Sequence, residues 1–160
     1  MAVDMFLKLG DIKGESVDDK HKDEIDVLSW SWGMSQSSTT HMGGGGGAGK
    51  VAVSDLHITK YTDSASPNLM LSCCTGKHYD EATLVIRKAG DKPLEYLKIK
   101  MSEVLISSVQ WAGSGADDRL TESVTLNFGK VNQVYTPQKA DGSGGAAIEA
   151  TFNIAHNVKE

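Results

Sequence analysis

The sequence contains only two cysteines, and they are neighbours, Cys73 and Cys74. Adjacent cysteines rarely bond to each other, because disulfide geometry requires a greater separation between the two Cα atoms. We interpret the pair as reduced thiols of a cytosolic fold, in preference to a redox centre or a metal site.

Long apolar runs are absent as well. No stretch reaches about 18 apolar residues, the length that spans a membrane. The first ten residues, MAVDMFLKLG, lack the basic region and the longer apolar core of a secretory signal. We therefore expect the protein to mature in the cytoplasm and to use no cleaved signal peptide for any later export.

Basic residues are in deficit, with 16 Lys and Arg against 21 Asp and Glu, which leaves a net charge of −5. This balance disfavours a nucleic-acid binder, which usually presents a basic face. It is typical of a soluble protein that resists non-specific association. The length of 160 residues predicts a single domain over residues 1–160, large enough to bury roughly two-thirds of its unfolded surface.

Motifs for catalysis and metal binding are missing too. The five histidines have no metal-ligand spacing, and the serines form no GxSxG elbow. We expect His57, inside a strand, to be partly buried, and the other four histidines to be solvated. The acidic pairs Asp18-Asp19 and Asp117-Asp118 are interpreted as solvated loop charge. The sequence predicts no catalytic residue, no metal site and no cofactor.

One segment, Gly44 to Lys50, nearly matches a phosphate-binding P-loop. The motif requires Ser or Thr after the lysine to hold magnesium, but this sequence has Val51 there. A P-loop also lies between a buried strand and a helix, whereas a polar run precedes this segment and a strand-like run follows it. A nucleotide-dependent enzyme therefore remains a disfavoured alternative.

What the sequence does contain is an alternating strand that leads into a glycine-rich arm. In Ile25 to Met34, one face carries Leu28, Trp30, Trp32 and Met34, and we expect it to be buried. The arm, at about residues 40–50, contains five consecutive glycines and ends at a lysine: Gly43, Gly44, Gly45, Gly46, Gly47 and Lys50. Glycine backbone is entropically expensive to fix, so we expect the arm to become ordered against something outside its own domain.

The rest of the chain consists mostly of short alternating segments typical of strands. One helix is expected between Ser64 and Gly76, with Ser66 as its cap, Pro67 at its first helical position and Gly76 at its C-terminal end. Many strands with one helix predict a mainly β fold, a small antiparallel β-barrel that is closed or nearly closed.

Two of the expected strand faces are polar but carry no charge. One comprises Thr121, Ser123, Thr125 and Asn127, and the other comprises Ser29, Ser31 and Gly33. Solvent-facing strands usually include Lys and Glu, which discourage unwanted pairing. These faces are either the wet side of an ordinary barrel, with Thr present for its strand propensity, or the lining of an enclosed wet space.

Long blocks of the sequence also resemble the haemolysin-coregulated protein (Hcp) family. The blocks cover most of the chain from residue 2 to about residue 142: AVDMFLKLGDIKGES, EIDVLSWSWGMSQS, HMGGGGGAGKV, SPNLM, GKHY, LVIRKAG, DRLTESVTLNF and PQKADG. Members of this family are tube subunits of the bacterial type VI secretion system. Their fold is a small β-barrel with a helix packed against it, similar to that of phage tail-tube proteins.

The resemblance implies a homohexameric ring that stacks into a tube inside a contractile sheath, with a trimeric spike protein at the tip. It implies ejection from the bacterial cytoplasm into the extracellular space or a target cell. The ring lumen would hold small effectors, with Ser31 as the best single contact candidate, Ser29 beside it, and Thr121, Ser123 and Thr125 as weaker ones. The arm from Gly43 to Lys50 would reach an adjacent subunit or ring. The alternative from a different class is a monomeric secreted β-sandwich binding module.

Overall fold

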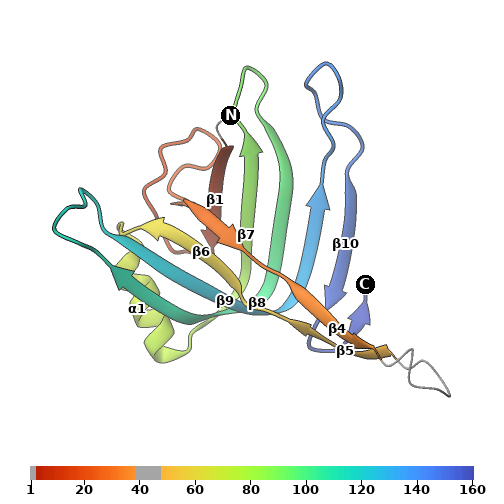
Figure 1. The fold of residues 1–160 in the computed structure, drawn as a ribbon, viewed down its shortest axis with the longest axis horizontal. Coiled ribbons are helices and arrows are strands. Elements are labelled where there is room, and N and C mark those ends of the chain that lie inside the picture. The colour runs from red at the N-terminus through yellow and green to blue at the C-terminus, as the bar shows by residue number, and fades with distance from the viewer. Residues whose placement is uncertain (1–2, 39–47) are drawn as a thin grey trace.

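The computed structural model describes residues 3–38 and 48–160. Within them the protein is mainly β, with one short helix (Figure 1). The elements are β1 (Val3–Leu9), β2 (Ile25–Asp26), β3 (Ser29–Ser31), β4 (Met34–Ser38), β5 (Ala48–Val53), β6 (Leu56–Tyr61), α1 (Ser66–Thr75), β7 (His78–Lys88), β8 (Leu94–Ala112), β9 (Thr121–Tyr135), β10 (Ile148–Asn153) and β11 (Val158–Lys159).

Two long strands, β8 and β9, form the backbone of the main antiparallel sheet. Along one edge of β9, β6 pairs with residues 121–126 and β10 pairs with residues 130–135. The other edge of β9 pairs with β8, and β8 pairs in turn with β7 over residues 94–105. β1 then joins the far edge of β7. Each long strand therefore pairs with different neighbours along its length: β9 with β6 and then with β10, and β8 with β7 only over its first part.

The backbone between β2 and β3 brings the two ends of this sheet together. Val27 N–H donates to the carbonyl of Met5 in β1 (3.0 Å), and Leu28 N–H donates to the carbonyl of Thr59 in β6 (2.8 Å). The chain thus changes its pairing partner between two consecutive residues. Covalent continuity from β2 to β3, rather than a ladder between them, completes the rolled sheet.

This change of partner corrects the expectation of one alternating strand from Ile25 to Met34. The segment is divided into β2, β3 and the start of β4. Trp30 and Trp32 are half-buried against the core, as expected, but Leu28 and Met34 are 41% and 56% exposed, and Val27 is buried instead. The alternation of buried and exposed side chains is interrupted where the segment leaves β2 and enters β3.

The barrel interior is filled by aliphatic side chains that alternate with outward residues along each strand. Ala82, Leu84 and Ile86 of β7 meet Ile99 and Met101 of β8 in register. Other buried members are Leu7, Leu9, Ile25, Leu56, Ile58, Val104, Ile106, Val124, Leu126 and Phe128. Burial of such side chains contributes roughly 1.5–3 kcal/mol each, and this is the main force that rolls the sheet.

The helix α1 lies where the sequence predicts it and packs against β8. Gly76 adopts the left-handed conformation (φ 68°), and its N–H donates to the carbonyl of Ser72, so the predicted C-terminal end is confirmed. The predicted cap is wrong. Ala65 precedes the helix, and Ser66 is the first helical residue, with Pro67 second. The buried hydroxyl of Ser66 donates to the Glu122 carboxylate.

The loop at residues 10–24 also departs from expectation, since it is not uniformly solvated. Ile12, Ser16 and His21 are buried, and Asp18 pairs with Arg87. The expectations that His21 is solvated and that Asp18 is free loop charge are therefore wrong. Their partners lie on distant strands, which local sequence does not reveal.

Candidate functional site

Four strands, β3, β6, β9 and the C-terminal part of β8, bring polar side chains from distant segments onto one outward face. One row across these strands runs Ser31, His57, Thr125, Ser108, because each residue is the direct cross-strand neighbour of the next. A second row runs Ser29, Thr59, Ser123, Gln110, and a third runs Tyr61, Thr121, Ala112. We call these three rows the polar face.

The polar face collects all five side chains that the sequence identified as lumen candidates. Ser29 and Ser31 come from β3, whereas Thr121, Ser123 and Thr125 come from β9. β6 lies between the two strands and pairs with both. The sequence indicated two separate uncharged faces, and the sheet topology makes them one continuous surface.

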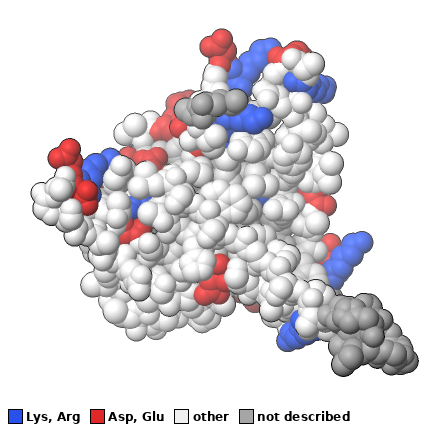
Figure 2. All heavy atoms as spheres, in the orientation of Figure 1, with Lys and Arg blue, Asp and Glu red and all other residues white. Residues whose placement is uncertain are grey.

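The face carries no formal charge because the charged residues of these strands point inward. Lys60 of β6 and Glu122 of β9 are direct cross-strand neighbours, and both side chains are completely buried. Lys60 Nζ also donates to Asp63 Oδ1 (2.8 Å) and to the carbonyl of Tyr61 (2.9 Å). These bonds satisfy an ammonium group whose burial would otherwise be costly. In the orientation of Figure 1, the area over β6 and β9 is largely uncharged (Figure 2).

Sequence reasoning missed this buried pair, although a signal existed. Lys60 continues the apolar alternation of Leu56 and Ile58, and Glu122 occupies the same kind of position before Val124. Two opposite charges at buried positions of two strands indicate that the strands are neighbours in register.

The hydroxyl groups of the polar face fall into two sets. Thr125, only 8% exposed, has its Oγ1 within 2.7 Å of Ser107 Oγ and of Ser108 Oγ, and Ser107 Oγ donates to Asp55 Oδ2 (2.6 Å). Thr125 is therefore committed to the fold. By contrast, Ser29, Ser31 and Ser123 are exposed, and their side chains make no hydrogen bond among the described residues.

His57 is the one ionisable group in the first row. It is exposed, so the expectation that it is partly buried is wrong. It lies between exposed Ser31 and the edge of the Thr125 network. Asp55, which also accepts a hydrogen bond from Asn127 Nδ2 (2.9 Å), adds a carboxylate at one end of the face. No local sequence pattern connects Asp55 with this surface.

The opposite end of the face has a small charged cleft. Its lining comprises Glu15, Asp26, Leu28, Tyr61, Asp63 and Arg119. The Arg119 guanidinium lies 3.7 Å from the centre of the Tyr61 ring. Burial raises the pKa of Asp26, and the charge of Asp63 raises it further. Charge is thus confined to the two ends of the face.

Both edges of the four-stranded polar sheet lack a neighbouring strand within residues 3–38 and 48–160. β7 pairs with β8 only as far as Leu105, so residues 106–112 of β8 have a free edge. β3 pairs with β6 on one side, and no described strand pairs with its other side. Unpaired edges of this kind are ready to pair with another chain.

A two-stranded ribbon of β4 and β5 projects from the main sheet (Figure 1). At its base Ser54 N–H donates to the carbonyl of Gly33 (2.9 Å), Ser54 Oγ donates to the same carbonyl (2.8 Å), and Trp32 Nε1 donates to the carbonyl of Ser54 (3.0 Å). Gly49 lies against the carbonyl of Ser37, at a point where a Cβ would approach to 2.1 Å.

The arm expected at residues 40–50 therefore begins earlier, at Met34. Lys50 is exposed on β5, and the predicted contact residues Gly43 to Gly47 lie outside the described residues. After β5 the chain enters β6, with no helix between them. The near P-loop thus lacks the helix N-terminus that phosphate binding requires.

No group of three or more His, Cys, Asp or Glu is placed to hold a metal ion in the part of the chain that the structure describes. The same part contains no helix with the length and apolar character needed to cross a membrane. Cys73 and Cys74 are free thiols, the first half-buried and the second exposed.

These features define a mainly β protein in which a rolled antiparallel sheet carries one helix and a projecting ribbon. A family model described as "Type VI secretion system effector, Hcp" matches residues 6–135. The chain belongs to this Hcp family of type VI secretion proteins.

Individual relatives agree with this assignment. "Protein hcp1" of Pseudomonas aeruginosa is 61% identical over 161 residues, which cover 99% of each chain. A solved structure described as that of a type six secretion system protein superposes with a TM-score of 0.93 at 34% identity, covering 99% of this chain and 100% of the other. Hcp1 from Salmonella typhimurium superposes with a TM-score of 0.82 at 39% identity, covering both chains completely.

Proposed function

We propose that this protein is the tube subunit of a type VI secretion system, a structural protein that assembles into rings and stacks of rings. One observation carries the proposal: in a member of the Hcp family, an uncharged polar sheet has an edge on each side that no strand of the described residues pairs with. Two different free edges on one sheet suit a head-to-tail contact, which closes into a ring when the rotation between copies is right.

In this ring, β8 residues 106–112 of one copy pair with β3 of the next copy. The polar faces of all copies then form one continuous inner wall. Six copies per ring is the number that the family resemblance implies. The projecting ribbon, with exposed Lys50 and the glycine segment beyond it, reaches the adjacent subunit or ring.

The inner wall is the surface on which small effectors rest before ejection. Ser29, Ser31 and Ser123 have hydroxyl groups without a hydrogen-bond partner among residues 3–38 and 48–160, so each can donate to and accept from a passenger protein. Thr121 lies at the edge of the face, and Thr125 acts mainly through the network that holds its neighbours. A wall without formal charge would not select strongly for the charge of its passenger.

The remaining partners are other components of the type VI secretion system. A contractile sheath surrounds the tube, and a trimeric spike protein caps it. Contraction then carries the tube from the bacterial cytoplasm to the extracellular space or a target cell without a cleaved signal peptide.

Native mass spectrometry and negative-stain electron microscopy of the purified chain test the assembly. We expect a ring-sized species and annular particles at micromolar concentration. Deletion of residues 43–47 is expected to weaken stacking or ring formation. A protein that stays monomeric throughout, with a mass unaffected by this deletion, would favour the monomeric binding module.

Retention of a co-expressed small secreted effector tests the inner wall. Ser123→Glu places a carboxylate on the polar face, whereas Gln133→Glu places one on an exposed position of the same strand outside it. We expect the first variant to lose most of the retained effector and the second to behave like the wild type. Equal retention by both variants would exclude the polar face as the effector surface.

A further inference from the structure

Behind the polar face, one row of side chains is buried in its middle and exposed at both ends. The row runs Leu28, Lys60, Glu122, Trp111, because Glu122 pairs with Lys60 on one side and with Trp111 on the other. Leu28 N–H donates to the carbonyl of Thr59 (2.8 Å), which places Leu28 beside Lys60 at the start of β3. Leu28 and Trp111 are therefore the two ends of one row, on the two outer strands of the four-stranded sheet.

The helix α1 closes the middle of this row. Ser66 Oγ donates to the Glu122 carboxylate, and the side chains of Lys60 and Glu122 are completely buried. Leu28 is 41% exposed and Trp111 is 47% exposed. Neither outer strand has a further neighbour there among the described residues. The sheet thus leaves a large apolar side chain uncovered at each of its two edges.

The edge at Trp111 carries an apolar projection. The turn between β8 and β9 extends beyond the barrel (Figure 1). Leu120, at the end of this turn, is 55% exposed and lines one surface hollow together with Trp111. It lies across Gly113, where a Cβ would come within 2.4 Å of Leu120 Cδ2. Tryptophan is among the side chains that most often supply the binding energy of a protein–protein interface.

The edge at Leu28 carries a recess. Leu28 lines the charged cleft described above, whose volume is about 380 Å³. Tyr61 and Arg119 line the same cleft, with the guanidinium against the Tyr61 ring. A planar guanidinium beside an aliphatic side chain is a surface on which an aromatic ring packs well. This edge therefore suits an aromatic side chain of the kind exposed at the other edge.

The directions of the strands allow the two edges to meet. β8 is antiparallel to β9, β9 to β6 and β6 to β3, so β8 and β3 run in opposite directions. Two copies side by side in the proposed ring then join β8 of one to β3 of the next as an antiparallel pair. The two edges belong to the same rows of the sheet, so they overlap most when Trp111 faces Leu28 of the next copy. A shift in register shortens this overlap.

We propose that Trp111 of one copy packs on Leu28 of the next copy and fills the cleft beside it, as the apolar anchor of each subunit contact. This inference rests on the proposed ring and adds the contact residues and the register. The occupant is a second copy because the projection and the recess lie at opposite edges of one sheet in one chain. A contact of this head-to-tail kind repeats around a closed ring.

The register has a consequence on the polar face. One residue along from the anchor, Gln110 of one copy faces Ser29 of the next. Facing residues of an antiparallel pair have Cβ atoms roughly 4.5–5.5 Å apart, close enough for an engineered disulfide. Within one chain the same two residues are three strand spacings apart, about 14 Å, which is too far for a disulfide. A bond between them must therefore join two copies.

The disulfide test leaves Trp111 and Leu28 unchanged. Its background carries Cys73→Ser and Cys74→Ser, which remove the two free thiols. The variant Ser29→Cys with Gln110→Cys should give a ladder of linked chains after mild oxidation on a non-reducing gel. Ser29→Cys with Ala112→Cys, two residues out of register, is the matched control and should stay mostly unlinked. Linking of the control in preference to the Gln110→Cys variant would overturn the proposal.

A second variant tests the anchor itself. Trp111→Ser should raise the protein concentration at which half of the rings dissociate by roughly tenfold or more, measured by native mass spectrometry across a dilution series. Tyr135→Ser, at an aromatic residue of β9 that is also 47% exposed, should leave this concentration unchanged. Circular dichroism of the monomer shows whether each variant folds. The disulfide test decides the proposal if Trp111→Ser does not fold.

The two proposals fail in different ways. A wild-type protein that never forms rings refutes the tube subunit and the anchor together. A wild-type ring that Trp111→Ser leaves equally stable, or that gives no link between Ser29→Cys and Gln110→Cys, refutes the anchor alone.

Discussion

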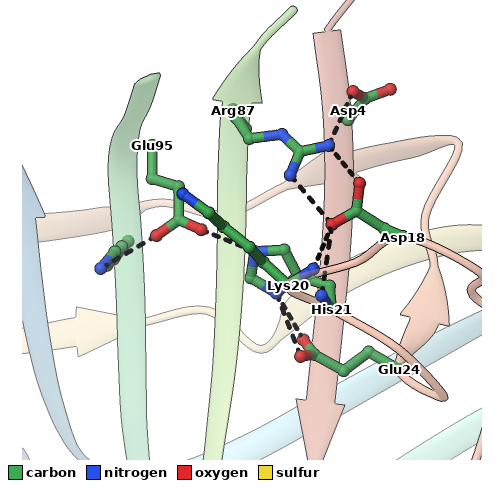
Figure 3. Close-up of polar contacts among 8 residues, drawn as sticks. Asp4, Asp18, Lys20, His21, Glu24, Arg87 and Glu95 are labelled. Carbon is green, nitrogen blue, oxygen red and sulfur yellow. Dashed lines mark hydrogen bonds and ion pairs between the residues drawn. The ribbon is translucent and has the colours of Figure 1, made fainter. Parts of the chain in front are cut away.

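The two outer sides of this barrel handle charge in opposite ways. On the polar face, formed by β3, β6, β9 and part of β8, Lys60 and Glu122 turn inward and leave an uncharged surface. The other side, which we call the strap side, is covered by the loop at residues 10–24. There, Asp18, Arg87, His21 and Glu95 lie outside the barrel and hold this loop of the same chain (Figure 3). Within the described residues the first side is exposed to solvent, whereas the second side is covered by a loop of the same chain.

The difference shows that a charged residue in a strand does not define which side faces water. The ion pair of Lys60 with Glu122 is buried beneath the polar face, so it leaves that face uncharged. The ion pair of Arg87 with Asp18 lies on the outer side of the barrel, where it holds a loop. The same barrel therefore carries one uncharged polar surface and one surface whose charges hold a loop of the same chain.

The largest effect is expected from breaking the buried pair behind the polar face. Glu122→Ala leaves the Lys60 ammonium without its main partner, so we expect a loss of about 3–5 kcal/mol in the free energy of unfolding. Urea denaturation measures this loss. The double variant Lys60→Met with Glu122→Leu should recover most of it, because no uncompensated charge remains between β6 and β9. A loss below about 1 kcal/mol for the single change would contradict this account.

A smaller effect is expected from the ion pair of Asp18 with Arg87 on the strap side, and it depends on pH. The hydrogen bonds from Arg87 lower the pKa of Asp18 to about 2 in the folded protein, from its ordinary value of 3.8. Its stabilising contribution is therefore fully present above the ordinary value and is lost as the pH falls from there through about 2. Asp18→Asn should flatten the acid dependence of the urea midpoint.

Asp19→Asn, the same change at the exposed neighbouring residue, is the matched control and should leave the acid dependence as in the wild type. An acid dependence that is the same in Asp18→Asn and in the wild type would show that the pair with Arg87 does not stabilise the fold.

The smallest effect concerns the two sets of hydroxyls on the polar face. Thr125→Val removes the hydroxyl that Ser107 and Ser108 contact, and we expect a loss of about 1 kcal/mol. Ser29→Ala removes a hydroxyl that the fold does not use, so the change should stay within about 0.5 kcal/mol. Thermal or urea unfolding distinguishes them. Equal effects would mean that Ser29 also supports the subunit.

Much of this architecture could be predicted from local patterns. The short alternating segments correctly predicted strands such as β7, and Gly76 correctly marked the end of α1. The uncharged positions Ser29, Ser31 and Ser123 were recognised because alternation assigns side chains to faces without knowledge of the neighbouring strand. The resemblance in long sequence blocks gave the family, which the family model confirms.

Local patterns failed wherever a residue depends on a distant partner. Leu28 was assigned to a buried face because the exchange of β1 for β6 as the pairing partner leaves no mark in the sequence. His21 and Asp18 were assigned to solvent because Glu95 and Arg87, which hold them, come from β8 and β7. Asp55 was overlooked because only the fold places it beside Ser107 and Asn127.

The sequence by itself determined the mainly β character, the position of the helix α1 and the presence of uncharged strand faces. These depend on the period of side chains along one segment and on glycine and proline at particular positions. Only the tertiary structure decided that two such faces join across β6, that Lys60 meets Glu122 and that His21 of the loop at residues 10–24 stacks on Phe6. The reason is physical: strand register and ion pairing are contacts between segments far apart in the chain, and they exist only after the sheet has rolled.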